Sequence, residues 1–99
     1  MKEITVSELK RRMSDRDRLF LLDVRQPDEF QESHIDGATL IPLGELKDRF
    51  SELNPSDEII VNCKAGGRSA RACEFLADKG FNVANLLGGN DRWQAEKDR

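Results

Sequence analysis

Two short apolar runs constrain the fold of this chain more than any other feature. Residues 18–24 read RLFLLDV and residues 58–63 read EIIVNC, and each run gives way to polar or charged residues. Continuous apolar runs of this length predict strands that are buried on both faces, as in a parallel sheet. Two weaker strands are predicted at residues 38–43 and 81–86, the first of them stopped by Pro42.

Helical patterns separate these predicted strands. The first helix spans residues 5–13, with Thr5 or Ser7 as its N-cap and Glu8 in the first turn. The other predicted helices occupy residues 27–33, 43–53 and 68–80, and the C-terminal segment 88–99 is predicted to be a turn followed by a terminal helix. The helix at 68–80 would bury Ala72, Cys73, Leu76 and Ala77 and end near Gly80. Alternating strands and helices predict an α/β fold whose mostly parallel sheet has helices on both faces.

Length and composition limit the organisation and the partners. A chain of 99 residues fits a single domain, 1–99, and we expect a monomer. The N-terminal sequence MKEITVSEL has no apolar signal core, and no run approaches the roughly 18 apolar residues of a membrane span, so we expect a cytoplasmic protein without membrane contact. The net charge of −3 argues against nucleic acid as a partner.

Two cysteines, Cys63 and Cys73, are separated by ten positions. Without a secretory signal a disulfide is not expected, and a zinc site would need more ligands than these cysteines and the single histidine, His34. We therefore expect no metal and no cofactor. Cys73 lies on the apolar face of a predicted helix, which is typical of a core residue; a resolving thiol is the alternative if it lies near Cys63.

The segment NCKAGGRSAR, residues 62–71, is glycine-rich and basic within an acidic chain. Cys63 ends a predicted strand and Arg68 begins a helix, so the residues between them must turn sharply, which Gly66 and Gly67 permit. Backbone N–H groups and the helix N-terminus can then face the thiol, together with the charges of Lys64, Arg68 and Arg71. Such surroundings lower a thiol pKa and predict a nucleophile, although a buried cysteine beside an ordinary glycine turn fits the same pattern.

Thiolate loops of this kind serve either phosphoryl transfer or sulfur transfer. Cysteine-dependent phosphatases usually have five residues between the cysteine and the arginine, whereas this chain has four, Lys64 to Gly67. A phosphoryl group presents three equatorial oxygens and needs a wide cradle. The shorter loop is better suited to a single additional sulfur atom on Cys63.

Nearly the whole chain resembles the single-domain rhodaneses, the sulfurtransferases related to thiosulfate:cyanide sulfurtransferase. Residues 21–43 are similar to the family's Asp-Val-Arg, Pro-x-Glu-Phe and His-Ile-x-Gly-Ala segments, and residues 61–81 to its Cys-x-x-Gly-x-Arg-Ser loop with the following helix. Residues 86–93 match its closing Gly-Gly-x-x-x-Trp. Ser33 stands where the family often has glycine, and residues 90–92 are more polar than usual. The resemblance implies a three-layer fold around about five strands.

The resemblance also implies a mechanism. Cys63 would take the outer sulfur of thiosulfate as a persulfide, cradled by the backbone from Lys64 to Ser69, and pass it to cyanide, a thiol or a sulfur-carrier protein. The substrate-binding residues would be Lys64, Ala65, Gly66, Gly67, Arg68 and Ser69, with Lys64 and Arg68 attracting the anionic donor. Asp23, Arg25 and Glu29 would support the loops. His34 could be a general base but is expected to be structural, and Trp93 is expected to pack on the core.

Three other interpretations stay open at this point. The chain could be a phosphatase or arsenate reductase that uses the same cysteine loop. It could be a binding domain without enzymatic activity, although such a domain needs neither Cys63 nor Arg68. Residues 41–70 also resemble the C-terminal domains of larger enzymes that activate sulfur-carrier proteins, so the chain could be free-standing or part of a longer protein.

Overall fold

A computed structural model describes residues 1–97 and contains one five-stranded sheet. Every strand pairs in parallel with its neighbours, in the spatial order β1-β5-β4-β2-β3. The strands are β1 (Glu3–Ile4), β2 (Phe20–Asp23), β3 (Thr39–Leu40), β4 (Glu58–Asn62) and β5 (Asn82–Leu86). The predicted α/β fold with a sheet of about five strands is confirmed.

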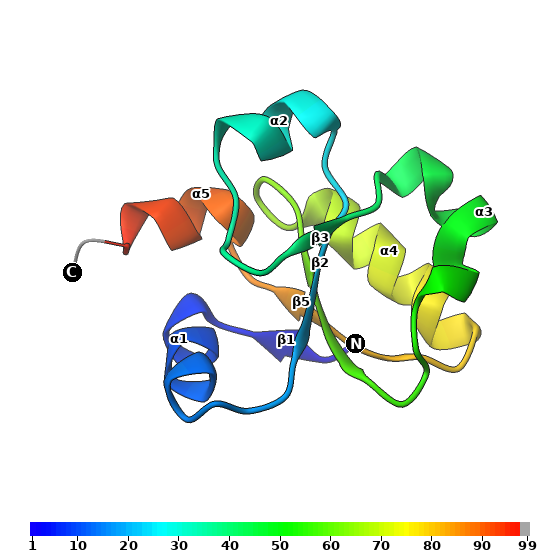
Figure 1. The fold of residues 1–99 in the computed structure, drawn as a ribbon, viewed down its shortest axis with the longest axis horizontal. Helices are drawn as coiled ribbons and strands as arrows, with labels where there is room; N and C mark the ends of the chain where they lie inside the picture. Colours follow the sequence, from blue (N-terminus) through cyan, green and yellow to red (C-terminus); the bar gives the residue numbers. More distant parts are fainter. Residues whose placement is uncertain (98–99) are drawn as a thin grey trace.

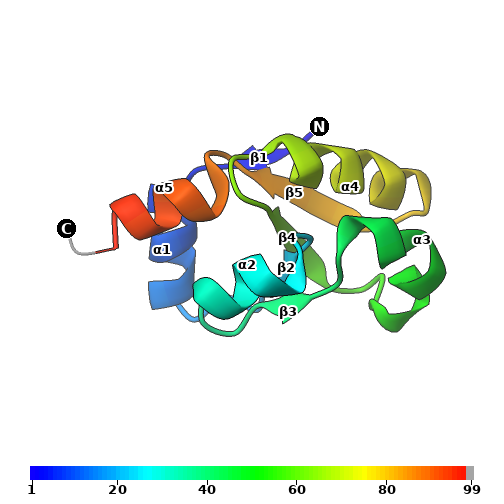
Figure 2. The ribbon, with the colours of Figure 1, turned by 90° about the horizontal axis from the view of Figure 1, so that it is seen from above.

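The helices form a layer on each side of the sheet (Figures 1 and 2). On one side lie α1 (Val6–Ser14) and α5 (Gly89–Ala95), and on the other lie α3 (Leu46–Arg49) and α4 (Gly67–Asp78). The short helix α2 (Pro27–Glu32) sits above one edge of the sheet, close to the loop that follows β4. As expected, Thr5 caps α1, its Oγ1 accepting the N–H of Glu8 at 3.1 Å.

Two apolar clusters, one on each face of the sheet, form the core. Alternating residues of β4 point to opposite faces, as the strand period requires: Ile59 and Val61 join the cluster beneath α3 and α4, and Ile60 joins the cluster beneath α1. Trp93 of α5 packs against the second cluster, as predicted. The continuous apolar run of β4 therefore contributes side chains to both buried clusters.

The structure corrects the predicted elements at several places. Strand β1 was not predicted; it has only two residues and pairs with β5 at the sheet edge. The strand expected at 38–43 shortens to Thr39–Leu40, although the N–H groups of Ile41 and Leu43 still donate to the carbonyls of Asp23 and Val24. The helix expected at 43–53 breaks into a 3₁₀ turn, Leu43–Glu45, then α3, then a second 3₁₀ turn, Phe50–Glu52.

The buried face of α4 also differs from the prediction. Ala72, Cys73 and Leu76 are buried as expected, but Ala77 is exposed and Ser69 takes its place on the inner face. The inner face therefore follows positions 69, 72, 73 and 76. Gly80 follows the helix with a φ of 91°, which confirms its role at the helix end.

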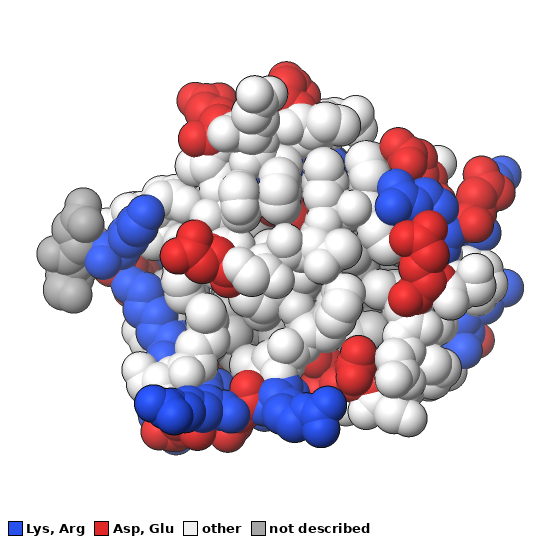
Figure 3. Space-filling view, viewed as in Figure 1, with Lys and Arg blue, Asp and Glu red and all other residues white. Residues whose placement is uncertain are grey.

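Charged side chains are unevenly spread over the surface. On the face shown in Figure 3 they gather over α1 and over α3, whereas the surface around β3 between them is mainly uncharged. Within residues 1–97, no helix has the length and apolar character needed to cross a membrane.

Candidate active site

The carboxyl ends of β2 and β4 lie side by side, because Asp23 pairs with Asn62 in the parallel register. The charged segment after β2 and the cysteine loop after β4 therefore meet at one edge of the sheet, as predicted, and α2 lies over the same edge (Figure 1). Ligands of open α/β sheets bind outside this edge. The predicted site residues are thus brought together by topology.

The Cys63 thiol lies inside a tight turn between β4 and α4. Its Sγ accepts the backbone N–H of Gly66 at 3.0 Å and lies 3.2 Å from the Ser69 hydroxyl oxygen. Gly66 has a φ of 119°, a conformation that favours glycine, whereas Gly67 begins α4 without a positive φ. Only the first of the two glycines is therefore required by backbone conformation.

The surroundings of Cys63 lower its pKa below that of an ordinary thiol. Burial alone would raise this pKa, since a thiolate is poorly solvated inside a protein. Hydrogen bonds from the Ser69 hydroxyl and from the backbone N–H groups of Ser69, Gly66 and Ala65 outweigh that effect and favour the thiolate. This direction agrees with the nucleophile predicted from the loop sequence.

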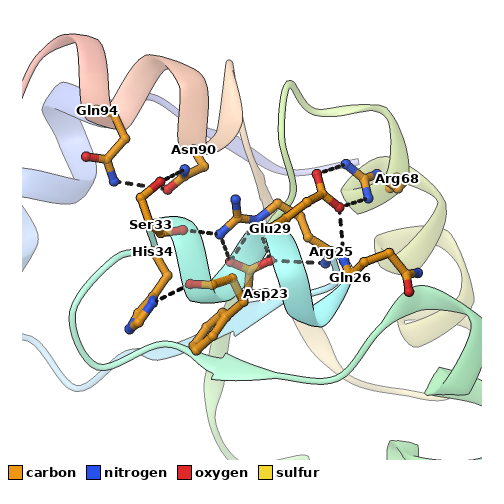
Figure 4. Close-up of polar contacts among 10 residues, drawn as sticks. Asp23, Arg25, Gln26, Glu29, Ser33, His34, Arg68, Asn90 and Gln94 are labelled. Carbon is orange, nitrogen blue, oxygen red and sulfur yellow. Dashed lines mark hydrogen bonds and ion pairs between the residues drawn. The ribbon is translucent and has the colours of Figure 1, made fainter.

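Both cations expected to bind the donor already have carboxylate partners. Arg68 forms a two-pronged ion pair with Glu29 at 2.7 and 2.9 Å (Figure 4), and Lys64 Nζ lies 2.8 Å from an Asp91 carboxylate oxygen. The hydrogen bonds from Arg68 lower the pKa of Glu29 to about 2. Glu29 also accepts the backbone N–H of Gln26 at 3.0 Å, so it connects the start of α2 with the start of α4.

A buried ion pair supports the loop after β2. The Arg25 guanidinium binds both carboxylate oxygens of Asp23 at 2.8–3.1 Å and donates to the Ser33 carbonyl at 2.7 Å (Figure 4). Asp23 and Arg25 are almost completely buried. This geometry ties the end of β2 to the residue after α2 and is consistent with the supporting role proposed for both residues.

The first residues of α5 bond the backbone of the cysteine loop, a contact that the sequence motifs did not predict. The backbone N–H of Asn90 donates to the Cys63 carbonyl at 2.8 Å, and that of Asp91 donates to the Lys64 carbonyl at 3.0 Å. A Cβ atom on Gly89 would lie 2.5 Å from the Cys63 carbonyl oxygen. The Gly-Gly pair before this helix could have signalled such a close backbone approach.

Two buried asparagines near the loop were also missed. Asn85 on β5 accepts the Ser69 hydroxyl and donates to the Gly66 carbonyl at 3.2 Å. Asn62, immediately before Cys63, is buried, and its side-chain nitrogen and oxygen have no hydrogen-bond partner within residues 1–97. Isolated asparagines in a strand carry no sequence signal for either environment.

His34 and Cys73 take the positions expected of structural residues. The His34 ring stacks on Phe30 with centroids 3.8 Å apart, and its Nδ1 lies 2.8 Å from the Phe30 carbonyl (Figure 4). Cys73 is buried in the apolar cluster beneath α4, and burial raises its pKa to about 11. Both cysteines are free thiols.

A metal centre finds no support in the described part of the chain, residues 1–97. No group of three or more histidine, cysteine, aspartate or glutamate side chains there could hold an ion.

Comparisons with known proteins agree with the fold. The family model of the rhodanese-like domain matches residues 5–96. The crystal structure of a rhodanese-related protein from Thermoplasma volcanium superimposes with a TM-score of 0.91 at 31% identity, covering 97% of this chain and 93% of the other.

Two curated relatives come from Bacillus subtilis. The putative sulfurtransferase YtwF is 32% identical over 97% of this chain and 93% of its own length. The putative sulfur carrier protein YrkF is 38% identical over 92% of this chain, which spans only 50% of YrkF.

Proposed function

The chain belongs to the rhodanese-like domain family, and from this premise we propose that it is a sulfurtransferase in which Cys63 carries sulfane sulfur as a persulfide. One observation carries the proposal. The Sγ atom of Cys63 lies at the centre of a turn whose backbone N–H groups point toward it, and hydrogen bonds from these groups and from the Ser69 hydroxyl to the thiolate lower its pKa. The name of YtwF, a putative sulfurtransferase, supports the same reaction class.

The proposed cycle has two halves. In the first, the Cys63 thiolate attacks the outer sulfur of thiosulfate, the S–S bond of the donor breaks, and sulfite leaves with the bonding electron pair. In the second, a thiolate or cyanide acceptor attacks the outer sulfur of the Cys63 persulfide, and the Cys63 thiolate is released. No net electron transfer to the protein occurs, so the cycle needs no redox cofactor.

The turn favours the anionic states of this cycle. The backbone N–H groups of Ala65, Gly66 and Ser69 bond the thiolate and would cradle a persulfide at the same place. Four residues, Lys64 to Gly67, separate Cys63 from Arg68, and this short cradle suits one sulfur atom better than a phosphoryl group. For this reason we favour sulfur transfer over phosphatase chemistry.

Anion binding would require the ion pairs Arg68–Glu29 and Lys64–Asp91 to rearrange. Arg68 and Lys64 are each neutralised by a carboxylate, so a thiosulfate dianion would compete with Glu29 and Asp91 for them. Charge attraction would still draw a small anion to these guanidinium and ammonium groups. We therefore propose thiosulfate or a persulfide as donor, and a thiol, cyanide or a sulfur-carrier protein as acceptor.

The test is an intact-protein mass spectrum after incubation with thiosulfate, repeated after addition of cyanide. We expect the mass of one sulfur atom to appear on the peptide that contains Cys63 and to disappear with cyanide. Cys63→Ala should abolish the gain, whereas Cys73→Ala, the matched control, should retain it. The absence of a gain with both thiosulfate and a persulfide donor would contradict the proposal and favour a binding domain without activity.

A further inference from the structure

A small polar network that contacts the Cys63 thiol includes Asn85, a residue with no part in the cycle proposed above. The Ser69 hydroxyl oxygen lies 3.2 Å from Cys63 Sγ and 3.2 Å from the Gly66 carbonyl oxygen, and it also bonds Asn85 Oδ1. The Asn85 side-chain nitrogen lies 3.2 Å from the same Gly66 carbonyl. Ser69 and Asn85 are 0% and 5% exposed, so water does not compete for these contacts.

The chemistry of the partners fixes the direction of each hydrogen bond. The Gly66 carbonyl can only accept, so the Asn85 atom that faces it must be the NH₂ group, and Oδ1 must face Ser69. Asn85 Oδ1 and the Gly66 carbonyl oxygen are both acceptors within reach of the Ser69 hydroxyl, and Asn85 Oδ1 is the nearer of the two, so we assign the Ser69 hydrogen to Asn85. A hydroxyl has one hydrogen, and while Asn85 holds it, Ser69 can only accept a hydrogen bond from Cys63.

We propose that Asn85 is a positioning residue that holds the Ser69 proton away from Cys63 and thereby favours the thiol over the thiolate. The hydrogen bond from the Ser69 hydroxyl that lowers the Cys63 pKa is a bond to the thiolate, and it forms only when Ser69 turns its hydrogen to Sγ. That turn leaves Asn85 Oδ1 unpaired in a buried place, so Asn85 opposes it. The backbone N–H groups of the turn act in the opposite direction. The inference rests on the proposed role of Cys63 as the nucleophile, because only then does its protonation state govern the reaction.

Other charged and titratable groups face this site from the surrounding elements. Arg68 of α4 interacts electrostatically with Cys63 and is paired with Glu29 of α2, and Cys73 of α4 interacts with Cys63 as well. The remaining groups at this edge are two ion pairs, Lys64–Asp91 and Asp23–Arg25. A substitution at Asn85 changes none of these charged groups. It does remove the donor to the carbonyl of Gly66, whose N–H bonds Cys63 Sγ, so a background without the Ser69 hydroxyl is needed to assign a shift to the Ser69 proton.

The test is the pH dependence of Cys63 alkylation by iodoacetamide, followed by mass spectrometry of tryptic peptides. Cleavage after Lys64 and Arg71 places Cys63 and Cys73 in different peptides. We expect Asn85→Leu, which removes the acceptor at similar volume, to lower the midpoint of the Cys63 profile by about one pH unit. Asn82→Leu, at an exposed position of the same strand, is the control and should keep the wild-type midpoint.

The Ser69→Ala background separates this mechanism from a general loosening of the loop. Without the Ser69 hydroxyl, Asn85→Leu should leave the midpoint unchanged, whereas a loosened loop would shift it equally in both backgrounds. An equal shift, an unchanged midpoint or an upward shift in Asn85→Leu would each overturn the proposal. If Asn85→Leu does not fold, Asn85→Ala carries the same expectation.

Alkylation requires no sulfur donor or acceptor, so the two proposals can fail separately. A downward midpoint shift that depends on Ser69, in a protein that gains no sulfur from any donor, would support the role of Asn85 and reject the sulfurtransferase cycle.

Discussion

At the scale of single residues, Glu29 neutralises Arg68, and we predict that this pairing limits the charge available to the proposed anionic donor. Its two carboxylate oxygens accept hydrogen bonds from the two terminal guanidinium nitrogens, at 2.7 and 2.9 Å. In Glu29→Gln the amide keeps the shape and can still accept the Gln26 N–H, but it no longer neutralises Arg68. We expect the apparent KM for thiosulfate to fall roughly threefold to tenfold, because a charge-assisted bond no longer competes with the anion.

The matched substitution for this experiment is Arg68→Ala, which should raise the same KM. Steady-state sulfur transfer at constant ionic strength measures both variants, since screening changes surface ion pairs. An unchanged KM in Arg68→Ala would show that Arg68 does not bind the donor. A raised KM in Glu29→Gln would show that the ion pair keeps the donor site in its binding conformation.

Asn62 allows a second prediction at residue scale, which concerns stability. Its buried amide has no hydrogen-bond partner within residues 1–97, and an unpaired buried polar group costs about 1–3 kcal/mol. Asn62→Leu removes that cost at similar volume, so the free energy of unfolding in urea should rise by about 1 kcal/mol. A loss of stability in this variant would instead indicate that the amide holds a buried water molecule.

At the scale of secondary-structure elements, the start of α5 acts as a clamp on the cysteine loop. Gly89 has a φ of 56°, and a Cβ there would meet the carbonyl oxygens of Cys63 and Lys64 at 2.5 and 2.6 Å. Gly89→Ala must move backbone that Asn90 and Asp91 now bond. We expect a loss of about 2–4 kcal/mol in the free energy of unfolding, together with slower Cys63 alkylation.

Gly44→Ala is the control for this substitution. Gly44 has no positive φ, and a Cβ there meets no atom within 4 Å, so its effect on stability should stay below about 1 kcal/mol. Urea unfolding and the alkylation rate are measured for both variants. If Gly89→Ala proved as stable as Gly44→Ala, the clamp would have no energetic role.

Elements with a long apolar pattern could be predicted from the sequence, and those that depend on neighbours could not. β4 and α4 are defined by their own residues, and so is the turn between them, which places Cys63 at the sheet edge. In contrast, β1 exists only because β5 lies beside it, and residues 43–53 pack as three short turns instead of one helix.

The candidate site also has one part that could be predicted from the sequence and one part that could not. The cysteine loop and its glycines were visible as a motif. The partners of its cations were not, because Glu29 and Asp91 lie 39 and 27 positions away from Arg68 and Lys64 in the chain. Folding brings these carboxylates to the loop, and motif spacing alone could not identify them.

At the scale of the whole molecule, arginine–glutamate pairs distributed over the surface connect stability to pH. The pKa values of three glutamates, Glu29, Glu52 and Glu58, are lowered first of all by hydrogen bonds from an arginine: Arg68, Arg49 and Arg12, respectively. A carboxyl group whose folded pKa is depressed stabilises the protein above its ordinary pKa of 4.5, and this contribution is lost as the pH falls toward the folded pKa.

The last prediction follows from the direction of these shifts. The free energy of unfolding should decline as the pH falls from about 5 to about 2, the window between the ordinary pKa of Glu29 and its folded value of about 2. Glu29→Gln cannot take up the proton and should lose less stability over this window, by about 1–2 kcal/mol after allowance for partial solvent exposure. Urea unfolding at closely spaced pH values measures the difference. Glu74→Gln, at an exposed glutamate of α4 without an ion pair within residues 1–97, should follow the wild-type curve, and identical curves for all three proteins would show that the Arg68–Glu29 pair does not contribute to the acid sensitivity of the fold.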